Sequence, residues 1–174
     1  MKKAICIMGI LSMILSLIGC LPGRYIPGTT RTEKKRIEES AEKHLNNVLS
    51  ALESGDKEAF ENLFTNDVKA QDNFQIGVDY TFDFFSGKIL SCEKAGNYVT
   101  GEHIGPKEYM CSYAEAIYKL TTDQKQYLLS FVFIWDCGIR ENNDKLGAFE
   151  LIPSDEKYFN LDNGYGIVYW IPEN

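Results

Sequence analysis

The chain has 174 residues and a formal net charge of −7 at pH 7. A chain of this length is typical of one globular domain, which buries roughly 70% of the surface of the unfolded chain. Acidic side chains occur along the whole chain, and this argues against nucleic acid and anionic lipid headgroups as partners, because both need a basic patch.

The first twenty residues have the layout of a secretory signal. Lys2 and Lys3 precede an apolar run over residues 4–18, which is too short to cross a bilayer core comfortably as a helix. The segment ends in four residues that resemble the lipobox of bacterial lipoproteins: Leu17, Ile18, Gly19 and Cys20. The resemblance implies cleavage before Cys20 and acylation of its side chain. Two or more acyl chains would hold the mature chain on a membrane.

We therefore expect three parts: a signal peptide over residues 1–19, the lipidated Cys20 with a flexible tether over residues 20–32, and a single α+β domain over residues 33–174. Prolines, glycines and little apolar periodicity in residues 21–32 are typical of a linker. The expected location is the extracytoplasmic face of a bacterial membrane, with a Gram-positive surface favoured over a Gram-negative outer membrane. The alternative is an uncleaved anchor or an ordinary signal peptide in which Cys20 has no role.

Apolar periodicity predicts three helices in the first half of the domain. A stripe at helical spacing marks residues 33–53, and Ser54, Gly55 and Asp56 supply a helix stop and a new N-cap. A second, shorter helix is predicted over residues 57–68 and a third over residues 72–86. His44 is expected to be half exposed, on the flank of the first helix.

After residue 87 the pattern changes to that of strands. Short strands are predicted over residues 88–94 and 98–103, long ones over 109–120, 127–139 and 146–152, and a last one over 166–171. Because short polar turns separate the long strands, the expected topology is an antiparallel meander.

Three cysteines remain in the expected mature domain, so at most one disulfide can form within it. If the turn of the first long hairpin centres on Gln124, Cys111 lies directly opposite Cys137, within disulfide reach. This register predicts a Cys111–Cys137 disulfide. Three free thiols, Cys92 included, are the alternative.

Three helices followed by a curled antiparallel sheet resemble the cone of the nuclear transport factor 2-like superfamily, which includes ketosteroid isomerase. The local match is the helix–helix junction at residues 54–60, of sequence SGDKEAF, continued by Leu63 and Phe64. The resemblance covers about residues 33–152 and implies an apolar pocket between helices and sheet. That superfamily includes enzymes, binders and assembly factors, so the fold does not choose a function.

The sequence contains no familiar catalytic, cofactor-binding or metal-binding motif, and neither a cofactor nor a metal is expected. Two residues are candidates for acid–base chemistry. His103 is expected in a loop at the rim, and Asp136 ends an apolar strand, where enclosure would raise the pKa of its carboxyl group. The alternatives are a rim histidine without a role and a carboxylate that caps a turn.

Six aromatic residues are candidates for lining a pocket in the concave sheet, and filling of an ordinary core is the default reading. They are Tyr80, Phe84, Tyr109, Tyr118, Phe133 and Trp135.

Three functional readings follow. The first is a non-catalytic, lipid-anchored domain that binds a small apolar ligand or an envelope protein. The second is an isomerase-like or hydrolase-like enzyme that uses Asp136 and His103. The third is a structural or interaction module, which predicts a filled cone and an exposed apolar patch.

Overall fold

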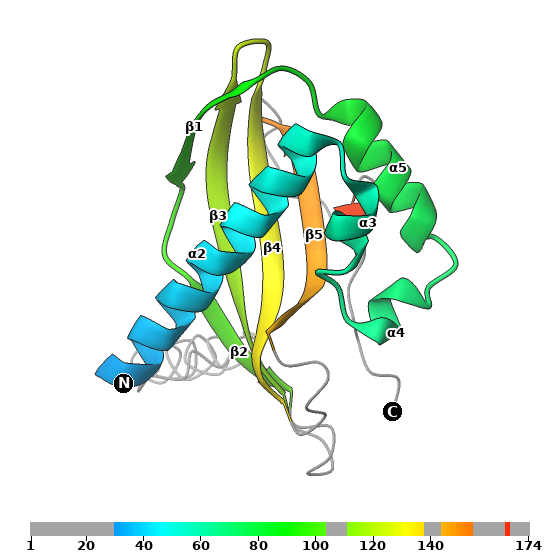
Figure 1. The fold of residues 1–174 in the computed structure, drawn as a ribbon. Helices are drawn as coiled ribbons and strands as arrows, with labels where there is room; N and C mark the ends of the chain where they lie inside the picture. The colour runs from blue at the N-terminus through cyan, green and yellow to red at the C-terminus, as the bar shows by residue number, and fades with distance from the viewer. Residues whose placement is uncertain (1–29, 104–110, 138–143, 155–165, 168–174) are drawn as a thin grey trace, which may run out of the picture.

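The computed structural model describes residues 30–103, 111–137, 144–154 and 166–167. In this part of the chain, helices cover one face of an antiparallel sheet, as Figure 1 shows. The α+β class predicted from the sequence is therefore confirmed. The predictions for the signal peptide, Cys20, most of the tether and Tyr109 fall on residues outside the described part.

The long first helix, α2, runs over Arg31–Ser54 and confirms the first predicted helix. Thr30 and Glu33 form a reciprocal capping box at its start, and Gly55 ends it in the left-handed conformation. Its buried face packs on the sheet through a stripe that includes Ile37, Ala41 and Val48.

The single second helix predicted over residues 57–68 is wrong. The structure has two short helices, α3 over Lys57–Glu61 and α4 over Asn66–Lys69. Between them the backbone pairs with the sheet: Leu146 N donates to Leu63 O at 2.8 Å, and Thr65 N donates to Leu146 O at 3.0 Å. A bridge to a strand distant in sequence thus replaces the local helical bonds. The third predicted helix is confirmed as α5, Phe74–Phe84.

The sheet has six strands within the described residues, all paired antiparallel in the spatial order β1-β3-β4-β5-β6. Their bounds are Ile89–Lys94 (β1), Val99–His103 (β2), Cys111–Thr122 (β3), Gln126–Cys137 (β4), Lys145–Pro153 (β5) and Gly166–Ile167 (β6). β1 pairs with one end of β3 and β2 pairs with the other end. The two short strands therefore share one outer edge of the sheet.

The β3–β4 hairpin contains a bulge at Trp135. Along most of the hairpin, from the Thr121–Gln126 pair to the Tyr113–Ile134 pair, the register differs by one residue from that of a turn centred on Gln124. Trp135 is the extra residue, and beyond it Cys111 lies opposite Cys137. The predicted turn centre was wrong, but the predicted opposition of the two cysteines is confirmed for the backbone.

The space between the helices and the sheet holds an aromatic core. Phe60 packs edge-on against Phe149, with ring centroids 5.0 Å apart, and also contacts Phe64 and Phe82. Phe131, Phe133 and Tyr127 contribute from the central strand β4. Full burial of such side chains stabilises the fold by roughly 1.5–3 kcal/mol each.

Candidate functional site

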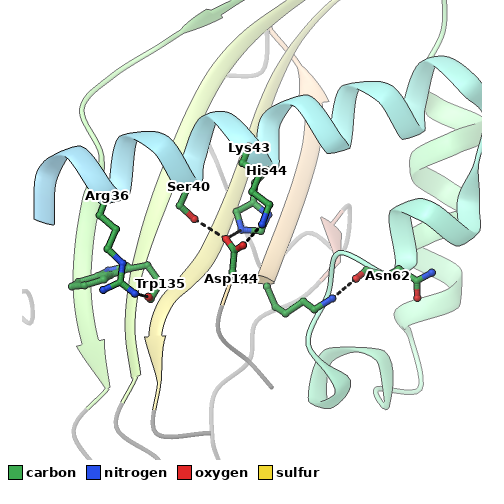
Figure 2. Close-up of polar contacts among 8 residues, drawn as sticks. Arg36, Ser40, Lys43, His44, Asn62, Trp135 and Asp144 are labelled. Carbon is green, nitrogen blue, oxygen red and sulfur yellow. Dashed lines mark hydrogen bonds and ion pairs between the residues drawn. The ribbon is translucent and has the colours of Figure 1, made fainter. Parts of the chain in front are cut away.

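A polar cluster joins α2 to the start of β5 (Figure 2). Three side chains of α2 converge on one carboxylate, that of Asp144. Ser40 Oγ donates to Asp144 Oδ1 at 2.9 Å, Lys43 Nζ pairs with Oδ2, and His44 Nε2 lies 3.2 Å from Oδ1. Residues three and four apart share a helix face, which is why these three reach the same point. We call this set the Asp144 cluster.

Asp144 is held in an uncommon backbone conformation. Its φ of 59° is left-handed, which aspartate tolerates better than most residues, and its N–H donates to Ile134 O at 2.7 Å. Burial alone would raise the pKa of this carboxyl group. The hydrogen bonds from Lys43 and Ser40, with the charges nearby, outweigh burial and hold the pKa below its ordinary value. The carboxylate is therefore charged at neutral pH.

His44 is buried, with only 2% of its surface exposed, so the sequence-based expectation of a half-exposed residue was wrong. Its ring packs against Phe131 and Phe133, with centroids 6.2 and 5.5 Å away. Burial lowers its pKa to about 4, against the opposing effect of Asp144. The imidazole is therefore neutral at pH 7. The spacing of residues could have predicted this burial. His44 lies three residues after Ala41 and four before Val48, within the apolar stripe of α2.

The ring nitrogens of His44 lack well-formed hydrogen bonds among the described residues. Nε2 lies 3.2 Å from Asp144 Oδ1, a contact that becomes an ion pair when the ring is protonated, and Nδ1 has no hydrogen-bond partner in the described ranges. A buried polar group without a good partner destabilises a fold by about 1–3 kcal/mol. Because the ring is enclosed, it cannot act directly on a substrate in this conformation.

Two further contacts flank the Asp144 cluster (Figure 2). Arg36 Nη2 donates to Trp135 O at 3.2 Å, and its guanidinium lies 5.6 Å from the centroid of the Trp135 ring. Lys145 Nζ donates to Asn62 O at 2.7 Å. Polar contacts thus connect α2 to β4, and the end of α3 to β5.

The described backbone does not bring the two acid–base candidates together. Asp136 lies opposite Ser112 near the end of β4, and His103 lies opposite Cys111 at the end of β2. Because β3 separates them, their backbones are roughly 10 Å apart. The side chain of Asp136 is exposed, so the enclosure expected for it is not found. The side chain of His103 lies outside the described part, and both catalytic roles stay predictions.

The pocket candidates are dispersed over the core and its margins. Tyr118 and Phe133 belong to the buried core, where Tyr118 stacks on Phe131. Tyr80 stacks on Phe84 along α5, with centroids 5.6 Å apart, and both are half-buried. Trp135 is half-buried beneath Arg36. These five residues fill and border the core.

The cysteines differ in state. Cys111 is buried and disulfide-bonded, whereas Cys92 is a free, half-buried thiol whose pKa is raised by burial to about 11. The thiol of Cys92 is therefore protonated and poorly reactive at neutral pH. The backbone register brings Cys137 opposite Cys111, but the side chain of Cys137 lies outside the described part. The Cys111–Cys137 disulfide stays a prediction.

Exposed apolar side chains concentrate at the outer edge of the sheet. Among the described residues, the four large hydrophobic side chains that are well exposed are Ile76 (70%), Leu90 (65%), Val99 (57%) and Tyr113 (37%). Leu90 lies at an irregularity in β1, Val99 begins β2, and Tyr113 lies on β3 directly opposite Gly101 of β2. We call Leu90, Val99 and Tyr113 the edge patch, although Leu90 lies roughly 20 Å along β3 from Val99. No sequence signal had marked these residues.

No group of three or more His, Cys, Asp or Glu side chains in the described ranges is placed to hold a metal ion. No helix in this part of the chain is long and apolar enough to cross a membrane.

Comparison with protein-family models matches residues 47–152 to a family described as "Domain of unknown function (DUF5104)". The match covers roughly three fifths of the chain, from the second half of α2 to β5. No curated protein matches the sequence. Within the Asp144 cluster, Asp144 lies inside the matched span, whereas Ser40, Lys43 and His44 precede it.

Proposed function

We propose that this chain, which belongs to the DUF5104 family, is a non-catalytic interaction domain that binds another envelope protein along the β1–β2 edge of its sheet. In this proposal Cys20 carries the lipid anchor at the extracytoplasmic face of the membrane. Residues 21–29, which precede the N-cap of α2, would act as the tether, which spans roughly 30 Å when fully extended.

The edge patch is the observation that carries the proposal. Two of the four exposed large hydrophobic side chains of the described residues, Leu90 and Val99, belong to the edge strands, and a third, Tyr113, lies on the adjacent strand β3. In the described sheet, β1 and β2 pair only with β3, so their outer backbone groups face away from it. An open strand edge with exposed apolar side chains suits the addition of an extended segment from another protein.

The core favours a protein partner over a small apolar ligand. Tyr118 and Phe133, two of the side chains expected to line a pocket, pack within the core and contact Phe131. The acid–base pair that an enzyme would need is separated by β3, and Asp136 is exposed. The interaction reading predicts this combination of a filled interior and an exposed apolar patch.

Native mass spectrometry tests this proposal on the full-length protein, released gently from its own cell membranes in detergent. We expect a non-covalent complex with a second polypeptide. The double variant Leu90→Lys/Val99→Lys should lose that partner, because two charges would be buried against it. The matched control, Ile76→Lys on α5, should retain it, since Ile76 is equally exposed but lies away from the edge.

Two results would overturn the proposal. A bound small molecule of a few hundred daltons without a protein partner would favour the small-ligand reading. A protein partner that survives the double substitution would place binding on another surface.

A further inference from the structure

The Asp144 cluster has a property that partner binding at the sheet edge neither uses nor explains. It encloses a titratable ring, that of His44, in the contact that fastens α2 to the sheet. This inference does not depend on the proposed function.

We propose that the Asp144 cluster is an acid-sensitive latch: when the ring of His44 takes up a proton, the N-terminal half of α2, residues 31–44, detaches while the sheet stays folded. The first observation behind this is enclosure. The ring is 2% exposed and packs on Phe131 and Phe133, and Nδ1 has no hydrogen-bond partner in the described ranges. A charged imidazolium would thus lose its hydration and gain a single ion pair, that of Nε2 with Asp144, while Nδ1–H stayed without a partner there.

The charged groups around the ring come from α2 and from the start of β5. Among these groups, the carboxylate of Asp144 favours protonation of the His44 ring. The positive charges of Lys43 and Lys145 disfavour it. The carboxylate is already occupied by Ser40 and Lys43, which weakens its support for a second cation. Among the described side chains of β4, the rings of Phe131 and Phe133 pack against that of His44, and neither is charged. Together with burial, this arrangement lowers the pKa of His44 to about 4.

The attachments of the two halves of α2 explain why release would be local. From Arg31 to His44, the buried positions are Ile37, Ala41 and His44, and Arg36 adds its contact with Trp135. The second half is held by Val48, Ala51 and Leu52, with Leu45 and Leu49 packed against the same core, and it continues through Gly55 into α3. The first half therefore has the weaker hold. Its release would uncover Trp135 and Phe133 and lengthen the segment that precedes the folded part.

The direction of the pH effect is set by the difference in proton affinity of His44 between the attached and detached states. A detached His44 regains its ordinary pKa of 6.5, whereas the enclosed ring has a pKa of about 4, so the detached state binds protons more readily between these values. Acidification from pH 7.5 to pH 5 should raise the detached population about thirty-fold.

Hydrogen exchange with mass spectrometry tests the latch on the full-length protein in detergent, with protection expressed relative to an unstructured chain at each pH. We expect the protection of residues 35–44 to fall about thirty-fold between pH 7.5 and pH 5 and to stay well below that of β3 and β4 at both pH values, because these residues open without global unfolding. The variant His44→Gln should remove this pH dependence. The matched control, His103→Gln, should retain it, since His103 is the other histidine of the chain.

Three results would overturn the latch. They are constant protection of residues 35–44 across this range, an equal fall in His44→Gln, and protection of residues 35–44 equal to that of β3 and β4, which would show that these residues open only by global unfolding. If His44→Gln does not fold, NMR titration of His44 in the His103→Gln variant decides the question. A midpoint near 4 supports the latch, and a midpoint of 6 or above contradicts it.

Discussion

Asp144 shows how one side chain joins distant parts of this chain. Its carboxylate accepts a hydrogen bond from Ser40 and pairs with Lys43, both on α2. Its backbone N–H donates a hydrogen bond to the carbonyl oxygen of Ile134 on β4. It does this with a positive φ, which few residues other than glycine adopt readily. Neither the contacts nor the backbone angle can be inferred from the sequence NNDK, which reads only as a polar turn.

A pair of substitutions separates the side-chain role of Asp144 from its backbone role. Asp144→Gly and Asp144→Ala both remove the carboxylate, but only alanine is strained at a φ of 59°. We expect Asp144→Ala to be less stable than Asp144→Gly by about 1 kcal/mol in urea unfolding. Equal stability of the two variants would mean that the turn relaxes to another conformation.

His44 makes the stability of the whole domain depend on pH. Its folded pKa of about 4 lies below the unfolded value of 6.5, so the unfolded chain binds the proton more readily between these values. The free energy of unfolding should be constant above about pH 6.5 and fall by about 3 kcal/mol on acidification to pH 4. Urea titrations at several pH values measure this. The slope should disappear in His44→Gln, and its persistence there would assign the effect to other groups.

At the scale of elements, strand pairing was easier to predict than helix boundaries. The alternation of apolar residues located the strands of the meander, because both faces and the turns leave a local signal. The division into α3 and α4 leaves no local signal in the sequence, because it depends on hydrogen bonds between residues 63–65 and the distant Leu146. The bulge at Trp135 is similar. Trp135, its extra residue, lies in an apolar run that has no break in the sequence. The position of the bulge can be seen only from the pairing of β4 with β3.

The β2–β3 pair offers a test of close packing within the edge patch. A Cβ atom at Gly101 would collide with the ring of Tyr113, which lies directly opposite. We expect Gly101→Ala to destabilise the domain by at most about 1 kcal/mol, because the outer end of the exposed Tyr113 ring must move aside. Adding Tyr113→Ala should recover most of this loss, which a double-mutant cycle measures. Independent, additive effects would contradict the packing.

At the scale of the whole molecule, the sequence predicted the fold class better than the site. The spacing of apolar residues along the chain predicts the order of helices and strands. Helices on one face of an antiparallel sheet could therefore be expected. The Asp144 cluster could not, because it joins residues about a hundred positions apart in the chain. The edge patch was also missed, since exposure of Leu90 and Val99 depends on which strand ends the sheet.

The membrane anchor is a separate prediction about the whole protein. Cys20→Ser should remove the acylation site and release the chain from the membrane fraction, because the lipid chains supply the anchoring. Cys6→Ser, within the same expected signal peptide, is the matched control and should leave the protein on the membrane. Cell fractionation with mass analysis measures both. Unchanged membrane association of Cys20→Ser would show that another segment holds the chain.

The central claim is that a protein partner docks on the outer edge of the sheet. Photo-crosslinking in living cells tests it most directly, with the reactive residue placed at Val99 and, as the control, at Ile76 on α5. A partner docked on this edge should give one discrete crosslinked protein from Val99, which is absent from Ile76. Crosslinks of equal yield from both positions, or from Ile76 alone, would contradict docking at the β1–β2 edge.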